Sequence, residues 1–355
     1  MSSDDERGDV PFNDCPLPIA GRSEILLGHG SGGKLTSDLI ETIILPAFRN
    51  PLLGKLDDQA ILEVNGSRLA FTIDSYVVTP LFFPGGDIGE LAVNGTINDL
   101  AMGGARPLYL SLAFILEEGL AIADFERVVR SVREAARRAG VLVVTGDTKV
   151  VGRGSGDEMF ITTSGIGVVP EGIELSSSRV RPGDAILLSG TIGDHGIAIL
   201  AQREGMAFEE PLESDTAPLH ELVGEMLNAF PGIHAMRDPT RGGLAAALVE
   251  IASRQTVGME IDEGRVPIRE SVRGACELLG IDPMFVANEG KLVAFVPEEG
   301  ADAVLAAMRA HRCGAAAVRI GTVVEDRRGM VRVRTSIGGE RILDLPFGEV
   351  LPRIC

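Results

Sequence analysis

Hydrophobic and polar residues follow two different spacings along this chain, and each spacing predicts one kind of element. In some short segments apolar residues occupy every second position or form an unbroken run, which is typical of strands. In others they recur three and four positions apart, as on one face of a helix. Both halves of the chain alternate between the two patterns, so we expect an α/β (α+β layered) fold.

The first half places its organised elements after a glycine-rich segment at 28–33. Two strands are expected at 60–64 and 68–73, because the Asn65-Gly66 pair between them is a strong signal for a two-residue β-turn. The other expected elements are a helical segment reaching Ile44, a helix at 88–102, a buried strand at 108–116, a helix at 125–139, a strand at 141–144 followed by the polar segment 145–149, and a strand at 159–169.

The second half continues the alternation after a segment at 170–182 that is rich in Ser, Gly and Pro and predicts a domain boundary. At 355 residues the chain exceeds the usual size for one hydrophobic core, which also favours two domains. The predicted organisation is a disordered N-terminal segment (1–22), an N-terminal domain (23–170), a C-terminal domain (171–341) and a flexible tail (342–355).

The chain is acidic, since 51 Asp and Glu against 33 Lys and Arg give a formal net charge of −18. This charge disfavours binding to nucleic acid or to an anionic membrane, because affinity for either comes from Lys and Arg. An acidic protein that binds phosphate needs local cations, for which Mg²⁺ is the obvious candidate.

Cysteine use and the N-terminal sequence bear on the compartment. The four cysteines form no CxxC pair, which favours a reducing environment over a disulfide framework or structural zinc. The N-terminal residues are acidic and polar, unlike a signal peptide, and the apolar runs are too short to span a bilayer. These features predict a soluble, cytoplasmic protein.

The glycine-rich segment GHGSGGK at 28–34 has the groups that hold phosphate: unhindered backbone N–H groups, a helix N-terminus and the Lys34 ammonium. Its spacing matches the Walker pattern as far as the lysine. Leu35 occupies the Ser/Thr position that would bind Mg²⁺, so a standard P-loop is not expected. A simple flexible turn remains an equal alternative.

Acidic residues recur at or beside the ends of predicted elements, among small residues. Carboxylates that converge from rigid elements are the usual ligands of Mg²⁺ bound to nucleotide phosphates. Each Asp alone is more commonly a cap or turn residue, but several together with a phosphate-type loop favour a metal–nucleotide site. The candidates are Asp57, Asp58, Asp74, Asp99 and Asp147.

Two histidines and two further charged residues lie in or beside glycine-containing loops. His29 and His195 have no metal-ligand spacing, and we interpret them as local hydrogen-bonding residues. The ordinary interpretation of Lys149 and of Glu289 is that each forms a surface ion pair or lies in a solvated loop. Taken alone, neither marks a catalytic site.

The chain ends in Cys355, a thiol at the end of an arm that could visit more than one site. Arg353 would favour the thiolate, while the terminal carboxylate would oppose it. Prenylation is excluded, because that signal needs three residues after the cysteine. The ordinary alternative is that the chain ends in Cys by chance.

A set of short motifs resembles those of the HypE family of hydrogenase maturation factors, which are carbamoyl dehydratases of the aminoimidazole ribonucleotide synthetase (PurM-like) superfamily. The likeness covers residues 22–355, and its most specific mark is the terminal tetrapeptide. The motifs are GHGSGGK at 28–34, Asp57-Asp58, NDLA at 98–101, TGDTKV at 145–150, DPTRGG at 238–243, NEG at 288–290 and PRIC at 352–355.

The resemblance implies a two-domain PurM-like fold and a particular reaction. The N-terminal strands would form a β-barrel with a second copy in a homodimer, and ATP would bind between the domains near that interface. Cys355 would receive a carbamoyl group from the carbamoyltransferase HypF, and ATP would drive its dehydration to a thiocyanate. The cyano group would then pass to iron on the HypC–HypD scaffold complex, as a cyanide ligand of nickel–iron hydrogenase.

The same resemblance assigns roles to individual residues. Cys355 would carry the substrate, Glu289 would be the general base, and Lys149 would orient or polarise the reacting group. The residues implied in ATP binding are Gly28, Gly30, Gly32, Gly33, Lys34, Asp74, Asp99 and Asp147, and those implied as Mg²⁺ ligands are Asp57, Asp58, Asp74, Asp99, Asp147 and Asp238.

Two other classes of function stay open on the sequence alone. One is another ATP-dependent PurM-like synthetase or kinase, such as selenophosphate synthetase, which would have Cys or selenocysteine beside an N-terminal glycine-rich loop; Cys15 lies before Gly28 without that context. The other is a non-catalytic thiol carrier that uses only Cys355. The glycine-rich segment and the acidic residues argue against a carrier, which needs no nucleotide site.

Overall fold

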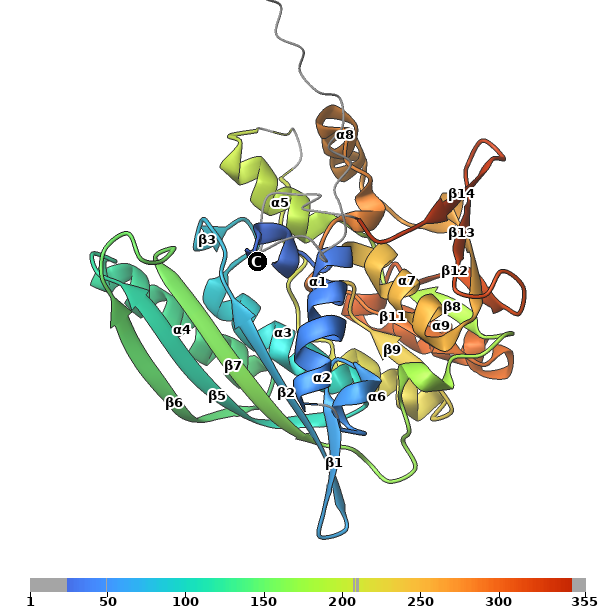
Figure 1. Cartoon of the computed structure of the whole chain (residues 1–355), viewed down its shortest axis with the longest axis horizontal. Coiled ribbons are helices and arrows are strands. Elements are labelled where there is room, and N and C mark those ends of the chain that lie inside the picture. Colours follow the sequence, from blue (N-terminus) through green and yellow to red (C-terminus); the bar gives the residue numbers. More distant parts are fainter. Residues whose placement is uncertain (1–23, 49, 207, 209–210, 347–355) are drawn as a thin grey trace, which may run out of the picture.

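The computed structural model describes residues 24–48, 50–206, 208 and 211–346. The predicted disordered segment 1–22 and Cys355 lie outside these residues. The described residues form two large sheets with helices packed against them (Figure 1). One hydrophobic cluster is shared between the two halves.

The N-terminal sheet has the strand order β1-β2-β7-β5-β6. Its β5 and β6 are parallel, and its other neighbouring strands are antiparallel. The turn between β1 and β2 has φ values of 51° at Asn65 and 80° at Gly66, as the predicted two-residue turn requires. The strands are β1 (Ala60–Val64), β2 (Ser67–Tyr76), β5 (Arg106–Glu117), β6 (Leu142–Val151) and β7 (Met159–Val168).

One face of this sheet is covered and the other is open. The helices α3 (Ile88–Met102) and α4 (Ile122–Arg138) pack on the covered face, where Val128 and Leu91 belong to one core cluster. The strand predicted as buried at 108–116 is therefore buried on one face only. The exposed apolar residues of the open face include Phe71, Ile73, Tyr109, Ile115 and Ile166.

The C-terminal sheet has the order β14-β13-β10-β12-β8-β11-β9. The helices α6 and α9 share a core cluster with Leu100 of α3, which joins this sheet to the N-terminal half, and α7 belongs to a second cluster. The elements are β8 (Ala185–Leu188), α5 (Asp194–Arg203), α6 (His220–Ala229), β9 (Ala235–Arg237), α7 (Gly243–Gln255), β10 (Gly258–Asp262), α8 (Glu270–Leu279), β11 (Val293–Val296), α9 (Glu298–Ala310), β12 (Val318–Val324), β13 (Val331–Arg334) and β14 (Glu340–Leu343).

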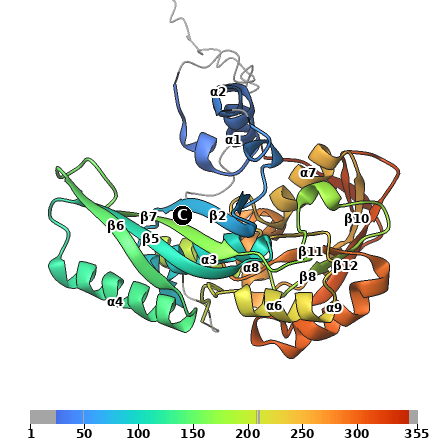
Figure 2. The same ribbon diagram turned by 90° about the horizontal axis from the view of Figure 1, so that it is seen from below.

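A helical segment follows the glycine-rich segment and consists of α1 (Lys34–Leu39), a π-helical turn (Ile40–Ile44) and α2 (Leu45–Phe48). Figure 2 shows it on the side of the N-terminal sheet opposite α4. A small hairpin, β3 (Phe82–Phe83) with β4 (Gly86–Asp87), precedes α3. Within the described ranges, none of the helices has the length and apolar character needed to cross a membrane.

Two sequence predictions need correction. The polar segment 145–149 does not follow a strand at 141–144 but lies inside β6, on the edge of the sheet. Of the predicted flexible tail, 342–355, the described part is packed: Leu343 is buried in β14, and Leu345 contacts the core of the C-terminal half.

Candidate active site

The glycine-rich segment forms a 3-10 turn, Leu27–Gly30, that leads into α1. Gly32 has a left-handed φ of 77°, and a Cβ at this position would lie 2.8 Å from the Arg241 carbonyl oxygen. A side chain at Gly32 would therefore be both strained and in collision with backbone. The segment that holds Gly28, Gly30, Gly33 and Lys34 thus packs against the loop of the predicted DPTRGG motif.

The root of the C-terminal tail also reaches the glycine-rich segment. The backbone N–H of Lys34 donates a hydrogen bond to the Pro346 carbonyl oxygen at 3.0 Å. A Cβ on Gly33 would lie 2.6 Å from the same oxygen, so the contact is close. The last described residue of the chain therefore lies at the start of α1.

Four of the predicted carboxylates form one electrostatic cluster: Asp58 before β1, Asp74 in β2, Asp99 in α3 and Asp238 after β9. Burial raises the pKa of Asp99 well above its ordinary value, and repulsion from Asp238, Asp58 and Asp74 raises it further. Burial also raises the pKa of Asp238, to about 6, despite the attraction of Arg237. The structure thus brings these four acids together from both halves of the chain.

Two arginines supply positive charge to this acidic cluster. Arg237 Nε lies 2.9 Å from Asp58 Oδ1, and Arg237 Nη2 lies 3.2 Å from Glu250 Oε2. Burial alone would lower the pKa of Arg237, but Asp58 and Glu250 raise it, so the guanidinium stays charged. Arg241 Nη2 lies 3.6 Å from Asp74 Oδ1. Neither arginine was among the predicted site residues, although Arg237 directly precedes the DPTRGG motif and Arg241 belongs to it.

The donor set fits Mg²⁺ that is bound mainly through nucleotide phosphate. Among the described residues, no three His, Cys, Asp or Glu side chains are arranged as a ready metal site. Mg²⁺ held with a nucleotide needs only one or two carboxylates, because phosphate oxygens and water complete its shell. Hard carboxylate oxygens that repel one another suit such a cation. Asp58 is the least available of the four, because it is paired with Arg237.

Asp57 has different partners from its neighbour Asp58. Its carboxylate accepts hydrogen bonds from Ser176 Oγ at 2.8 Å, from the Ser177 N–H at 3.1 Å and from Ser177 Oγ at 2.6 Å. These bonds fasten the segment before β1 to a 3-10 turn, Ser177–Arg179, at the start of the C-terminal half. The structure gives Asp57 a capping role, and its role as a Mg²⁺ ligand stays a prediction.

Asp147 and Lys149 lie away from the acidic cluster of their own chain. Both are exposed on β6, and Lys149 Nζ lies 3.5 Å from Asp147 Oδ2. Asp74 shares a transverse row of the sheet with Gly146, with β7 and β5 between them. Three strand spacings amount to about 14 Å along the sheet. Asp147 and Asp74 of the same chain therefore do not share a ligand shell.

Glu289 lies between α8 and β11 and is 5% exposed. Burial raises the pKa of the Tyr76 phenol well above its ordinary value, and the negative charges of Asp74, Asp99 and Glu289 raise it further. Glu289 therefore shares one electrostatic neighbourhood with two members of the acidic cluster. The buried Tyr76 was not among the predicted site residues, because its place in an apolar strand pattern does not show that it lies beside these carboxylates.

Comparison with known proteins agrees with this architecture. A family model for the N-terminal domain of AIR synthase related proteins matches residues 56–169, and the model for their C-terminal domain matches residues 181–334. The two sheets with their matched domains, and the glycine-rich segment facing an acidic cluster, define the chain as an AIR synthase related protein of the PurM-like class.

More specific relatives match nearly the whole chain. Carbamoyl dehydratase HypE of Cupriavidus necator is 56% identical over 342 residues, which are 96% of this chain and 97% of the relative. A solved structure of the hydrogenase maturation protein HypE in complex with ATP is 51% identical, with a TM-score of 0.79 over 94% of this chain and 100% of that one. A structure of a HypE–HypF complex gives 47% identity and a TM-score of 0.82, over 87% and 99%. The chain belongs to the HypE family of carbamoyl dehydratases.

Proposed function

We propose that this protein uses ATP to dehydrate a carbamoyl group carried on its own Cys355, giving a thiocyanate that supplies the cyanide ligand of nickel–iron hydrogenase. The observation that carries the proposal is the contact between Lys34 and Pro346, because it holds the root of the tail against the glycine-rich segment. The nine residues 347–355 reach at most about 30 Å when extended. Cys355 is therefore tethered within reach of the glycine-rich segment and the acidic cluster.

The chemistry explains why a phosphate donor is needed. Hydroxide is a poor leaving group, so the carbamoyl oxygen must first take the γ-phosphoryl group of ATP, and the C–O bond then breaks with phosphate leaving. The nitrogen loses both of its protons as the C≡N bond forms, while the S–C bond to Cys355 is kept. Carbamoyl oxygen ends in inorganic phosphate, and ADP is the other product.

Each part of this step has a candidate among the chain's residues. The glycine-rich segment and Lys34 would hold the polyphosphate, and Asp74, Asp99 and Asp238 would hold Mg²⁺, which neutralises phosphate charge when bound. Glu289 is the candidate base for the departing protons. Glu289 is buried, so its carboxylate is held out of bulk water.

The partner subunit would complete the site. Within the described residues, the N-terminal sheet leaves several strand edges without a neighbour, among them the outer edge of β6 and the edge of β2 at 72–76 beyond the end of β1. Pairing β6 of one copy with β2 of the other, twice about a two-fold axis, closes a barrel and removes both edges. It also brings Lys149 and Asp147 of one copy beside Asp74 of the other.

The exposed apolar residues support this homodimer. The open face of the N-terminal sheet presents Phe71, Ile166 and Tyr109 in one transverse row. An exposed patch of this kind on a sheet face marks an interaction surface. The α1–α2 segment stands on the same side of the sheet and exposes Ile43 and Phe48, so a second copy would cover both.

The reaction also needs partners before and after dehydration. A solved complex of HypE with HypF makes HypF the candidate carbamoyl donor for Cys355. The HypC–HypD scaffold with its iron is the candidate acceptor of the cyano group. A reactive thiol of this kind needs a reducing compartment, which agrees with a cytoplasmic location.

The test is mass analysis of the tail peptide. Protein carbamoylated by HypF is incubated with and without Mg-ATP, and the Cys355 peptide is measured. We expect ATP-dependent loss of one water from that peptide in the wild type and none in Glu289→Gln. A Cys355→Ala variant that still yields a cyano group would overturn the proposal.

A further inference from the structure

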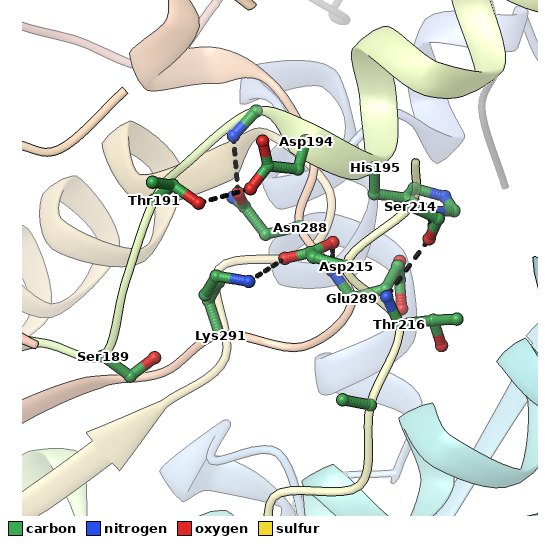
Figure 3. A network of polar contacts seen from close by, with 12 residues as sticks. Ser189, Thr191, Asp194, His195, Ser214, Asp215, Thr216, Asn288, Glu289 and Lys291 are labelled. Carbon is green, nitrogen blue, oxygen red and sulfur yellow. Dashed lines mark hydrogen bonds and ion pairs between the residues drawn. The ribbon is translucent and has the colours of Figure 1, made fainter. Parts of the chain in front are cut away.

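A buried polar network surrounds the backbone of Glu289 and includes residues to which the reaction assigns no role (Figure 3). Its centre is Asp215, in the irregular segment before α6, with a side chain only 3% exposed. Asp215 Oδ1 accepts a hydrogen bond from the Glu289 N–H at 3.0 Å, and Asp215 Oδ2 accepts one from Lys291 Nζ at 2.8 Å. One carboxylate therefore joins the residues on either side of Gly290.

The charge of Asp215 is maintained by these contacts. Burial alone would raise its pKa, but the Lys291 ammonium and the hydrogen bond from the Glu289 N–H lower it below its ordinary value. Asp215 is thus an anion held between a cation and a peptide dipole. Charge-assisted bonds of this kind are shorter and stronger than neutral ones.

The carbonyl side of Glu289 is held as well. Asn98 of α3 donates from Nδ2 to the Glu289 carbonyl oxygen at 3.3 Å and to the Ala217 carbonyl oxygen at 3.1 Å. A Cβ at Gly290 would lie 1.8 Å from the Asp215 carbonyl oxygen, so the two chain segments touch at this point. The backbone of Glu289 is therefore fixed on both sides of its Cα, in a packed region between the two halves.

The segment that carries Asp215 is itself anchored to the N-terminal half. The Ser214 N–H donates to the Pro84 carbonyl oxygen at 2.8 Å, and Ser214 Oγ lies 2.8 Å from His195 Nδ1. Asn94 of α3 donates from Nδ2 to Thr216 Oγ1 at 3.2 Å. The segment that carries Asp215 is thus hydrogen-bonded to the β3–β4 hairpin, to α3 and to α5.

We infer that Asp215 is a positioning residue for the reaction: its carboxylate fixes the Glu289 backbone, and the ion pair with Lys291 holds that carboxylate in place. The inference rests on the proposed role of Glu289 as base. A base displaced by a fraction of an ångström from the carbamoyl nitrogen transfers protons more slowly, and misplacement by about 1 Å can cost a hundredfold. The alternative is a buried ion pair that serves stability alone.

A pair of double variants, with a third as a substitute for one of them, separates positioning from stability. Asp215→Asn with Lys291→Met removes both charges but keeps an amide oxygen that can accept the Glu289 N–H. Asp215→Leu with Lys291→Met also removes both charges, and leaves that N–H without an acceptor. Asp215→Ser with Lys291→Met gives a second acceptor-free test if the Leu variant does not fold, because the serine hydroxyl is too short to reach.

The measurements are single-turnover dehydration of carbamoylated Cys355 with saturating Mg-ATP, the KM for ATP, and amide hydrogen exchange of the peptide covering 286–292. We expect the Asn variant to stay within about threefold of the wild-type rate, and the Leu variant to fall by about tenfold to a hundredfold with little change in KM. Exchange at the Glu289 amide should rise only in the Leu variant.

Equal rates and equal exchange in the two double variants, whether at the wild-type level or both reduced, would refute the role of Asp215. Glu289→Gln is measured beside them and tests the proposed function separately. A wild-type rate in Glu289→Gln refutes Glu289 as the base. A lost rate there, with no difference between the double variants, refutes only the positioning by Asp215.

Discussion

Replacing Asp238 by Asn should stabilise the nucleotide-free protein and weaken its response to Mg-ATP. Asp238 is buried among carboxylates, and its pKa is raised to about 6 from an ordinary value of 3.8, first by burial and then by Asp74. A rise of about two pKa units corresponds to about 3 kcal/mol of unfavourable free energy for the ionised form. Asn resembles the protonated carboxyl group, so Asp238→Asn removes this cost.

The pH dependence of that gain has a defined sign. Between about pH 4 and pH 6 the folded protein binds more protons at Asp238 than the unfolded chain does, so stability is lost as pH rises through this range. The stabilisation by Asp238→Asn should therefore be complete, about 3 kcal/mol, at pH 8, and roughly half as large at pH 5. Urea unfolding at both pH values measures it.

Asp238→Asn should also change the response of the protein to Mg-ATP. Mg-ATP should raise the melting temperature of the wild type more than that of Asp238→Asn, because the variant lacks one of the proposed Mg²⁺ ligands. Asp57→Ala is the control for removing a nearby carboxylate that is hydrogen-bonded instead of repelled. Loss of its hydrogen bonds to the 3-10 turn should destabilise the protein by about 1 kcal/mol. Destabilisation by Asp238→Asn at pH 8, or a gain in stability that does not change with pH, would refute the claim that the ionised Asp238 is unfavourable in the folded protein.

Three further predictions concern the subunit interface, a buried histidine and the tail. Mixing inactive Lys149→Ala and Glu289→Gln subunits should restore roughly a quarter of wild-type dehydration after random exchange, because one site of each mixed dimer regains both residues; continued inactivity of the mixture would place both residues in one subunit. Burial lowers the pKa of His195 to about 4, so the folded protein binds fewer protons than the unfolded chain between about pH 4 and 6.5. Stability should fall as pH falls through that range, and His195→Asn should remove about 2 kcal/mol of the loss at pH 5 in urea unfolding; identical pH profiles would contradict this. Gly33→Ala should displace the Pro346 carbonyl and accelerate proteolysis within 340–346, and unchanged cleavage would show that the contact does not hold the tail.

The sequence predicted the elements well where local patterns determine them. The Asn65-Gly66 turn, the helix at 88–102 and the strand at 159–169 all form as their local patterns indicate. The glycine-rich segment and the DPTRGG motif, far apart in the sequence, meet as a shared site requires. Glycines at both positions allow this close approach, which is a signal that a sequence can carry.

Other features depend on contacts that leave no periodic trace. The sequence of segment 145–149 lacks an alternating apolar pattern, because the segment is an edge strand with exposed side chains on both faces. Asp215 and Lys291 form their pair across many intervening residues, and the segment around Asp215 has no helix or strand pattern that would draw attention to it. Asp57 and Asp58 are adjacent, yet one caps a turn and the other pairs with Arg237. Only the tertiary structure separates such neighbours.

The central claim is that ATP activates the carbamoyl oxygen on Cys355, and an oxygen-isotope experiment tests it most directly. Cys355 is loaded with a carbamoyl group whose oxygen is oxygen-18, and the protein is incubated with Mg-ATP. The inorganic phosphate released and the tail peptide are then measured by mass spectrometry. We predict that the label appears in phosphate in step with formation of the cyano group on Cys355. Label found in water instead, or ATP hydrolysis with the carbamoyl group intact, would contradict the account.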